Sequence, residues 1–332
     1  YKGCQNSTCF ENSPRYVTFN QRLAPLLEEC MPIYQLLRPY AITGYGRLGK
    51  VPRPVPPSPS ISEREEMAVQ AAAPNEDLLV WIDGSLVPRS LAQVSVFDSS
   101  VQGGDAVWEG VRVYDGKIFL LDRHLRRLQA SAKALSFEAV PSSEDVTTAI
   151  MTTLAANGIR DAAHARVTLT RGKKTTSSMN PEFNVFGCTL IVLAERKEAN
   201  GVATYNNELG VKLVTASNRR NSPQCLDSVI HHNNLLINIL AKIEANVCGA
   251  ADAIMLDVDG FVSETNATNL FMVKNGVLLT PAKSSCLPDI MRGAILDLAA
   301  ELGLPTEVQR LPLTQFHSAD EVFTTGTMGE VR

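Results

Sequence analysis

Asp257-Val-Asp-Gly-Phe-Val-Ser-Glu-Thr-Asn-Ala-Thr-Asn269 is the stretch of this sequence that decides the fold. It lies between two apolar runs, Ala253–Leu256 and Leu270–Val273, which have the length and composition of buried strands. Its first four residues are typical of a turn. The pattern therefore predicts two strands that are joined through a polar connection.

Helical periodicity is the dominant pattern on both sides of that stretch. A helix is expected from Asn234 to Val247, where apolar residues recur at helical spacing. Another is expected to open at Leu287-Pro288 and to end before Gly303, because proline is favoured in a first helical turn and glycine just past a helix end. The apolar stripe of the first helix consists of Leu235, Ile239, Ile243 and Val247, with Leu236 and Leu240 beside it.

Strand and hairpin patterns alternate with two further helices before residue 200. Asp115-Gly116 is a typical hairpin turn, Asp122 is expected to cap one helix, and Ser143 to Ala156 forms the other. Hairpins interleaved with helices predict an α+β layer rather than a doubly wound sheet. The expected strands are Leu78–Ile82, Val94–Phe97, Gly110–Tyr114, Lys117–Leu121, Ala165–Leu169, Cys188–Leu193 and Val211–Thr215.

The domain organisation is indicated by a proline-rich run, residues 51–60, which predicts an extended linker. Ahead of it, Phe19 to Leu37 has the spacing of an amphipathic helix, and we interpret this short segment as the tail of an upstream domain. The chain opens with Tyr1 rather than Met, which indicates a processed or partial sequence. The expected division is an N-terminal segment (1–50), a linker (51–76), a small domain (77–196), a connection (197–207) and a large domain (208–332).

Composition and charge limit the class of protein. Of the 332 residues, 45% are hydrophobic, and the net charge of −4 is not typical of a nucleic-acid or membrane-surface protein. No apolar run reaches the roughly 18 residues of a membrane span. Seven cysteines without a CxxC pair favour free thiols in a reducing compartment, the cytoplasm or an organelle matrix. His231 and His232 lack a third suitably spaced ligand, so no metal site is expected.

Four segments, spread over most of residues 78–332, carry a resemblance to a known family. Their order and spacing resemble those of the branched-chain and D-amino-acid aminotransferases, the fold type IV group of pyridoxal-phosphate enzymes. The sequence is especially similar to that of plant proteins described as branched-chain-aminotransferase-like, in which such a domain lies at the end of a longer polypeptide. The segments are Val107-Trp-Glu-Gly-Val-Arg112, Asp257 to Asn269, Cys286-Leu-Pro-Asp-Ile-Met-Arg292 and Thr325-Gly-Thr-Met-Gly329.

The resemblance implies a two-domain fold of mixed α+β and α/β character, with a small α+β domain and a larger pseudo-barrel domain. It also implies a homodimer with the active site at the subunit boundary, pyridoxal phosphate as cofactor, and a small amino acid or 2-oxo acid as substrate. Glu264 matches the acid that pairs with the pyridine nitrogen. The positions matched to the phosphate and the rest of the cofactor are Arg112, Asn234, Leu287, Ile290, Met291, Thr327 and Met328, and those matched to the substrate carboxylate are Arg166 and Arg171.

The sequence departs from the family at the position of the catalytic lysine. That lysine forms a Schiff base with the cofactor and moves the substrate proton, and in relatives it lies four residues ahead of an asparagine. Counting back from Asn233 leads to Val229, whose isopropyl group can neither condense with an aldehyde nor carry a proton. Lys242 is excluded as a substitute because it would lie about 15 Å or more along the helix. Lys283 is left as the candidate substitute.

Two further departures fall in the phosphate-binding turn, where the family favours Leu-Pro-Gly-Ile-Thr-Arg. Met291 replaces a hydroxyl donor by a thioether, which loses about 1.5–3 kcal/mol when the acceptor is charged. Asp289 places a carboxylate where the phosphate would lie, and like charges about 5 Å apart repel by about 3 kcal/mol at an effective dielectric of about 20. Because the sequence stops at Arg332, just past the Gly-Thr turn, we also expect an incomplete large domain.

These departures predict a fold type IV aminotransferase homologue that lacks transaminase activity and that binds pyridoxal phosphate, if at all, without a covalent bond. One alternative is an active pyridoxal-phosphate-dependent aminotransferase or lyase that acts on a branched-chain or D-amino acid, in which either Val229 is a sequence anomaly or Lys283 is the substitute lysine. Another is a non-catalytic protein, either a scaffold or a binder of a phosphate ligand through Arg112 and Thr327.

Overall fold

The computed structural model describes residues 75, 77–197, 210–284 and 286–332. The helix expected at Phe19–Leu37 lies outside the described residues, as do residues 51–74 of the expected linker. In the part of the chain that is described, no helix combines the length and the apolar composition needed to cross a bilayer.

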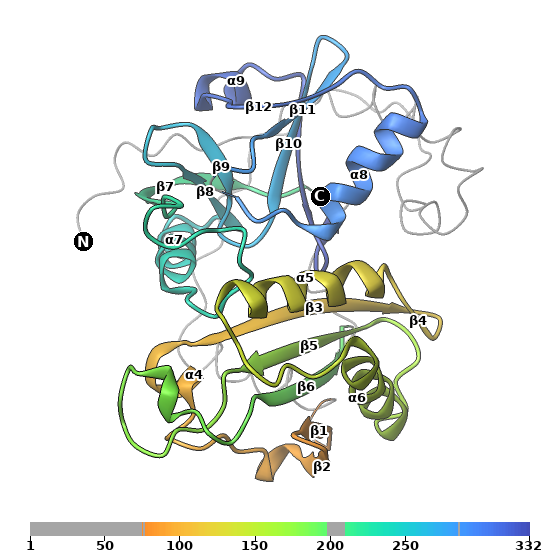
Figure 1. Ribbon diagram of the computed structural model, residues 1–332. Coiled ribbons are helices and arrows are strands. Elements are labelled where there is room, and N and C mark those ends of the chain that lie inside the picture. Colours follow the sequence, from red (N-terminus) through yellow and green to blue (C-terminus); the bar gives the residue numbers. More distant parts are fainter. Residues whose placement is uncertain (1–74, 76, 198–209, 285) are drawn as a thin grey trace.

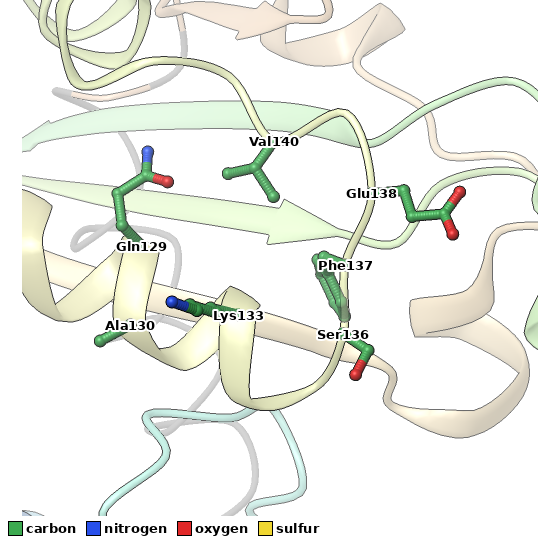
Figure 2. Close-up of a pocket in the computed structure, with 7 residues that line it drawn as sticks. All are labelled: Gln129, Ala130, Lys133, Ser136, Phe137, Glu138 and Val140. Carbon is green, nitrogen blue, oxygen red and sulfur yellow. The ribbon is translucent and has the colours of Figure 1, made fainter.

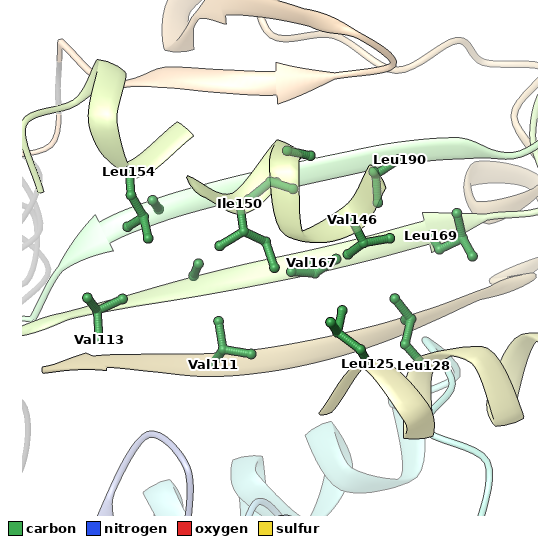
Figure 3. Packing of buried hydrophobic residues seen from close by; sticks show 14 of the residues in the cluster. Val111, Val113, Leu125, Leu128, Val146, Ile150, Leu154, Val167, Leu169 and Leu190 are labelled. Atoms are coloured by element: carbon green, nitrogen blue, oxygen red, sulfur yellow. The ribbon is translucent and has the colours of Figure 1, made fainter. Parts of the chain in front are cut away.

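A six-stranded antiparallel sheet forms the first half of the described chain (Figure 1). Helices α5 (Leu121–Ala134) and α6 (Ser143–Ala156) both pack on one face of it, because every second residue of β3 and β5 points into the same apolar core (Figure 3). The opposite face presents Trp108, Gly110 and Arg166 to a cavity. In spatial order the strands are β2 (Ser85–Pro88), β1 (Leu79–Ile82), β6 (Thr189–Arg196), β5 (Ala163–Thr170), β3 (Ala106–Tyr114) and β4 (Lys117–Ile118).

Two smaller sheets form the second half. Helix α7 (Leu236–Val247) packs its small residues Ala241 and Ala245 against the three-stranded sheet, and α8 (Ile290–Glu301) packs near the stacked rings of Phe271 and Phe323 on the five-stranded sheet. The three-stranded sheet has the order β7 (Leu213–Arg219), β8 (Asp252–Leu256), β9 (Val262–Thr265); the five-stranded sheet has the order β12 (Thr306–Gln309), β11 (Val277–Pro281), β10 (Asn269–Lys274), β13 (Glu321–Gly326), β14 (Glu330–Val331).

The remaining elements are short helices at the surface. They are η4 (Arg89–Leu91), α4 (Ser99–Gly103), η5 (Pro181–Phe183) and α9 (Leu313–His317).

Two of the expected elements were wrong, and one strand was missed, because the connection expected between Leu256 and Leu270 contains the buried strand β9 (Val262–Thr265). Val94–Phe97 forms no strand, because its side chains are exposed and the segment turns into α4, which Asp98 caps by accepting from the amide of Ser100. The strand expected at Lys117–Leu121 ends at Ile118. Leu120 adopts a left-handed conformation and starts α5, so Asp122 lies in the first turn and is not the cap.

Candidate functional site

The candidate site is a cavity of about 400 Å³ at which the open face of the six-stranded sheet meets the second half of the chain. Strands β3 and β5 contribute one wall. The other walls come from Arg127 of α5, Arg220, residues between 228 and 242, the turn after β9, the start of α8 and residues 325–329. The residues of the cavity therefore come from both halves of the described chain. Such a site forms only when the fold is complete.

One end of the cavity is closed by a buried cluster of charges around Arg127. The guanidinium of Arg127 forms a bidentate pair with Glu109, at 2.7 Å from Nε to Oε1 and 2.8 Å from Nη2 to Oε2. His124 and His231 also contact the Glu109 carboxylate, at 2.7 and 3.2 Å. Burial acts to raise the pKa of Glu109, but the charge of His231 and the hydrogen bonds of Arg127 and His124 hold it well below its usual range. The cluster therefore keeps an ionised carboxylate inside the protein.

Asp289 lies at the same end and caps α8. Its carboxylate accepts from the amide of Met291 at 3.2 Å and from Nη1 of Arg127 at 3.2 Å, and that same Nη1 also donates to the carbonyl of Pro288 at 3.1 Å. The first turn of a helix has amide groups without partners and carries the positive end of the helix dipole. In this chain the carboxylate of Asp289 occupies that position and accepts from one of the amides.

Glu264 lies at a second charged place in the cavity, paired with Arg220 at 2.7 Å. It also accepts from the amide of Leu287 and from Nδ2 of Asn269, both at 3.0 Å. Arg220 is held in turn by Ser228 and Asn238. Burial raises the pKa of Glu264 above its ordinary value, although the charge of Arg220 acts in the opposite direction.

Arg166 lines the cavity and pairs with no acid among the described residues. Its guanidinium stacks over Trp108, 3.8 Å from the ring centroid, and donates to Oδ1 of Asn233 at 3.2 Å. Burial lowers its pKa below the ordinary arginine value, as expected for a cation that is partly removed from water. The remaining donors of this planar fork are suited to a carboxylate in the cavity.

The structure brings some of the sequence-predicted residues into the cavity and leaves others outside it. Arg166, Glu264, Leu287, Thr327 and Met328 line it. The residues that do not line it are Val229, Asn234, Ile290, Met291, Arg112, which donates to the Ala163 carbonyl and to Glu330, and Arg171, which pairs with Asp105.

Several residues of the cavity were not predicted as site residues from the sequence, and Trp108, Arg127, Arg220 and Lys242 are among them. Trp108 stood inside a quoted motif, and Arg127 and Arg220 gave no signal that set them apart from surface arginines. The exclusion of Lys242 by its distance along the helix was wrong in one respect, since Lys242 does line the cavity. Its ammonium donates to the carbonyl of Ala251 and lies 3.7 Å from Asp252.

A second hollow, of about 460 Å³, lies beside the end of α5 (Figure 2). It is bordered by Lys133, Phe137 and Glu138, and it brings together no set of converging polar groups comparable to the first. Among the described residues no group of three or more His, Cys, Asp or Glu side chains is placed to hold a metal ion. The first cavity is therefore the candidate site.

Comparisons with known proteins agree with this choice. Residues 106–332 match the family described as amino-transferase class IV. Branched-chain-amino-acid aminotransferase-like protein 1 of Arabidopsis thaliana is 52% identical over 332 residues, which are 100% of this chain and 57% of that protein, so the chain spans little more than half the length of this curated relative.

Solved structures share the fold. The branched-chain amino acid aminotransferase of Escherichia coli has a TM-score of 0.71 and 31% identity, covering 77% of this chain and 84% of that one. The branched-chain amino acid aminotransferase of T.th., complexed with N-(5'-phosphopyridoxyl)-L-glutamate, has a TM-score of 0.70 and 32% identity over the same shares.

Proposed function

The chain belongs to the class IV aminotransferase family and has the mixed fold expected from its sequence. We propose that, unlike the active enzymes of this family, it does not catalyse transamination. The observation that carries the proposal is Val229, at the position that the family resemblance assigns to the catalytic lysine. Its side chain is 46% exposed and lies outside the cavity. An isopropyl group offers neither a nucleophile nor a base.

The other lysines described by the structure are poorly placed to substitute. Lys242 is at the cavity, but the Ala251 carbonyl and Asp252 hold its ammonium instead of leaving it free toward the interior. Lys283 is exposed in the loop after β11 and does not line the cavity. A nucleophilic lysine has to be within bonding reach of its target, so neither position supports covalent catalysis.

Pyridoxal phosphate, the cofactor that the resemblance implies, does not fit the charges at the cavity. Glu264, which is matched to the pyridine nitrogen, is already paired with Arg220, and a guanidinium beside that nitrogen opposes its protonation. At the other end Arg127 is already paired with two carboxylates of the chain, Glu109 and Asp289. Neither end supplies what the chemistry of this cofactor requires.

A second function, the binding of a small carboxylate, is favoured by Arg166. The guanidinium is stacked on Trp108 and has no acidic partner among the described residues, while the cavity beside it is large enough for a small amino acid or 2-oxo acid. We propose that the chain keeps a carboxylate-binding cavity without the covalent chemistry of the family.

The proposal is tested by treating the purified chain with pyridoxal phosphate or pyridoxal, reducing with borohydride and mapping peptides by mass spectrometry. We expect no pyridoxyl-lysine in the parent chain. Val229→Lys tests whether a long, flexible lysine restored between the lining residues Ser228 and Ile230 reaches the cavity and forms a single adduct. Val229→Arg is the matched control, since it adds a long cation that cannot form the adduct. A stoichiometric adduct on one lysine of the parent chain would overturn the proposal.

A further inference from the structure

The start of α8 and the side chain of Arg127 together supply groups that are typical of an anion-binding site. A helix of 12 residues begins there, and the side chain of Arg127 is only 9% exposed and directed at the same place. Free amides, the helix dipole and a buried guanidinium are the groups by which proteins bind a phosphate. In this chain one of these amides, that of Met291, and the guanidinium of Arg127 both donate to a carboxylate of the protein itself.

Asp289 uses these groups in two ways at once. One carboxylate oxygen accepts from the amide of Met291, and the other accepts from Arg127. The Asp289 side chain is 12% exposed, so this ion pair is largely shielded from water. Two donors that a phosphate ester could use, the Met291 amide and Nη1 of Arg127, are therefore already occupied by a residue of the chain.

We propose that Asp289 is a built-in replacement for a ligand phosphate and that the cavity accepts only ligands without a phosphate group. The proposal rests on the proposed function, because a chain without covalent cofactor chemistry has no need of the phosphate anchor. It adds the class of ligand: unphosphorylated small molecules, with a carboxylate directed at Arg166 rather than a phosphate directed at Arg127.

The local charge supports this selection. Arg127 is shared by Glu109 and Asp289, so its positive charge is already divided between two carboxylates before any ligand arrives. A phosphate dianion would meet the carboxylate of Asp289 in a place largely shielded from solvent, where like charges repel most strongly. An uncharged or carboxylate-bearing ligand that stays near Arg166 and Trp108 does not meet it.

The test compares two ligands that differ only in the phosphate, pyridoxal 5'-phosphate and pyridoxal, by calorimetric titration of the full chain. We expect the parent to bind pyridoxal and to bind the phosphate ester at least about tenfold more weakly. Asp289→Asn keeps an oxygen that can cap the helix but removes the charge, and Asp289→Gly removes both. In each variant the preference for the phosphate ester should rise by about tenfold or more, as expected for a regained charged hydrogen bond.

Inorganic phosphate gives a second readout that needs no ring to bind. Phosphate should raise the melting temperature of both Asp289 variants and leave that of the parent unchanged. The control is Asp297→Asn, which removes an exposed acid of the same helix that pairs with Arg123. A parent chain that binds pyridoxal phosphate as tightly as pyridoxal or more tightly, or variants with no gain for either probe, would overturn the inference.

Different measurements would contradict the two proposals made for this cavity, the absence of transamination and the role of Asp289. A borohydride-fixed lysine in the parent contradicts the absence of transamination chemistry and says nothing of the phosphate preference. A phosphate preference in the parent, without any adduct, contradicts the role of Asp289 alone.

Discussion

At the scale of single residues, Arg166 and Arg171 show how the same side chain acquires different roles. Both come from β5 or its end, and both were matched to a substrate carboxylate by resemblance. The charge of Arg171 is paired with Asp105 at 2.6 Å, and its guanidinium also donates to the carbonyls of Leu135 and Ser136. Arg166 is left to Trp108 and Asn233, so its charge is available to a ligand.

We therefore predict that Arg166→Gln lowers the affinity for a branched-chain 2-oxo acid, with 4-methyl-2-oxopentanoate as the probe. The loss should be about tenfold or more, because a charge-assisted bond of about 1.5–3 kcal/mol is removed. Isothermal titration calorimetry measures it. Arg171→Gln serves as the control and should leave the affinity unchanged. Equal losses in both variants would mean that the sheet, and not the cavity charge, determines binding.

At the scale of elements, the regular helices and strands could be predicted and the connections between them could not. Ser143–Ala156 was expected and observed with the same bounds, and in the structure Ser142 and Asp145 form a reciprocal capping box at its start. Val94–Phe97 alternates like a strand but has no neighbouring strand to pair with among the described residues. Strand periodicity describes one segment, while a strand also needs a partner, which the sequence does not give.

The site follows the same division. Glu264 and Thr327 were found in the cavity because they belong to recognisable motifs. Arg127 and Arg220 were missed because their importance comes from acids far away along the chain, Asp289 for one and Glu264 for the other. Such pairs exist only after the fold brings the segments together.

Strand β13 contains a carboxyl group whose ionisation should be visible in the stability of the protein. Burial raises the pKa of Glu321, opposite Val273 in the five-stranded sheet, from 4.5 to about 7. Below pH 4.5 the group is protonated in both states, and its contribution to stability is complete. Between 4.5 and about 7 the unfolded chain releases the proton first, so this contribution is lost as the pH rises.

Glu321→Gln should therefore raise the free energy of unfolding at pH 8, by about 1–2 kcal/mol once solvent screening of the half-buried side chain is allowed for. At pH 4 the two proteins should differ little. Urea unfolding at both pH values measures the difference. Glu301→Gln, at an exposed position of α8, is the control and should show no such dependence. A constant difference at both pH values would contradict the raised pKa.

At the scale of the whole molecule, the apolar stripe of α7 remains exposed, because none of the described residues of this chain covers it. The periodicity correctly predicted a helix, yet the face that packs on the three-stranded sheet is the small one, Ala241 and Ala245. Leu236, Ile239, Leu240, Ile243 and Val247 are each between 51 and 75% exposed. These positions lie at helical spacing on one side, and a contiguous apolar face of this kind marks an interaction surface.

We expect this face to be covered by a second copy of the chain, because Ile239 both belongs to the stripe and lines the cavity. An interface there would close the site from outside, as the family resemblance implies for an active site at a subunit boundary. Ile243→Glu places a charge at the middle of the stripe, where burial without a partner is costly. The variant should therefore sediment as a monomer under conditions in which the parent sediments as a dimer.

Sedimentation-velocity ultracentrifugation at several concentrations measures this difference. Lys133→Glu is the control, because it introduces the same side chain at an exposed position of a different helix, α5, and should leave the dimer intact. Since Ile243 itself does not line the cavity, a monomeric Ile243→Glu that also loses affinity for 4-methyl-2-oxopentanoate would connect dimer formation to the integrity of the site. A parent chain that remains monomeric at every concentration would show that the stripe is covered by a different partner or segment.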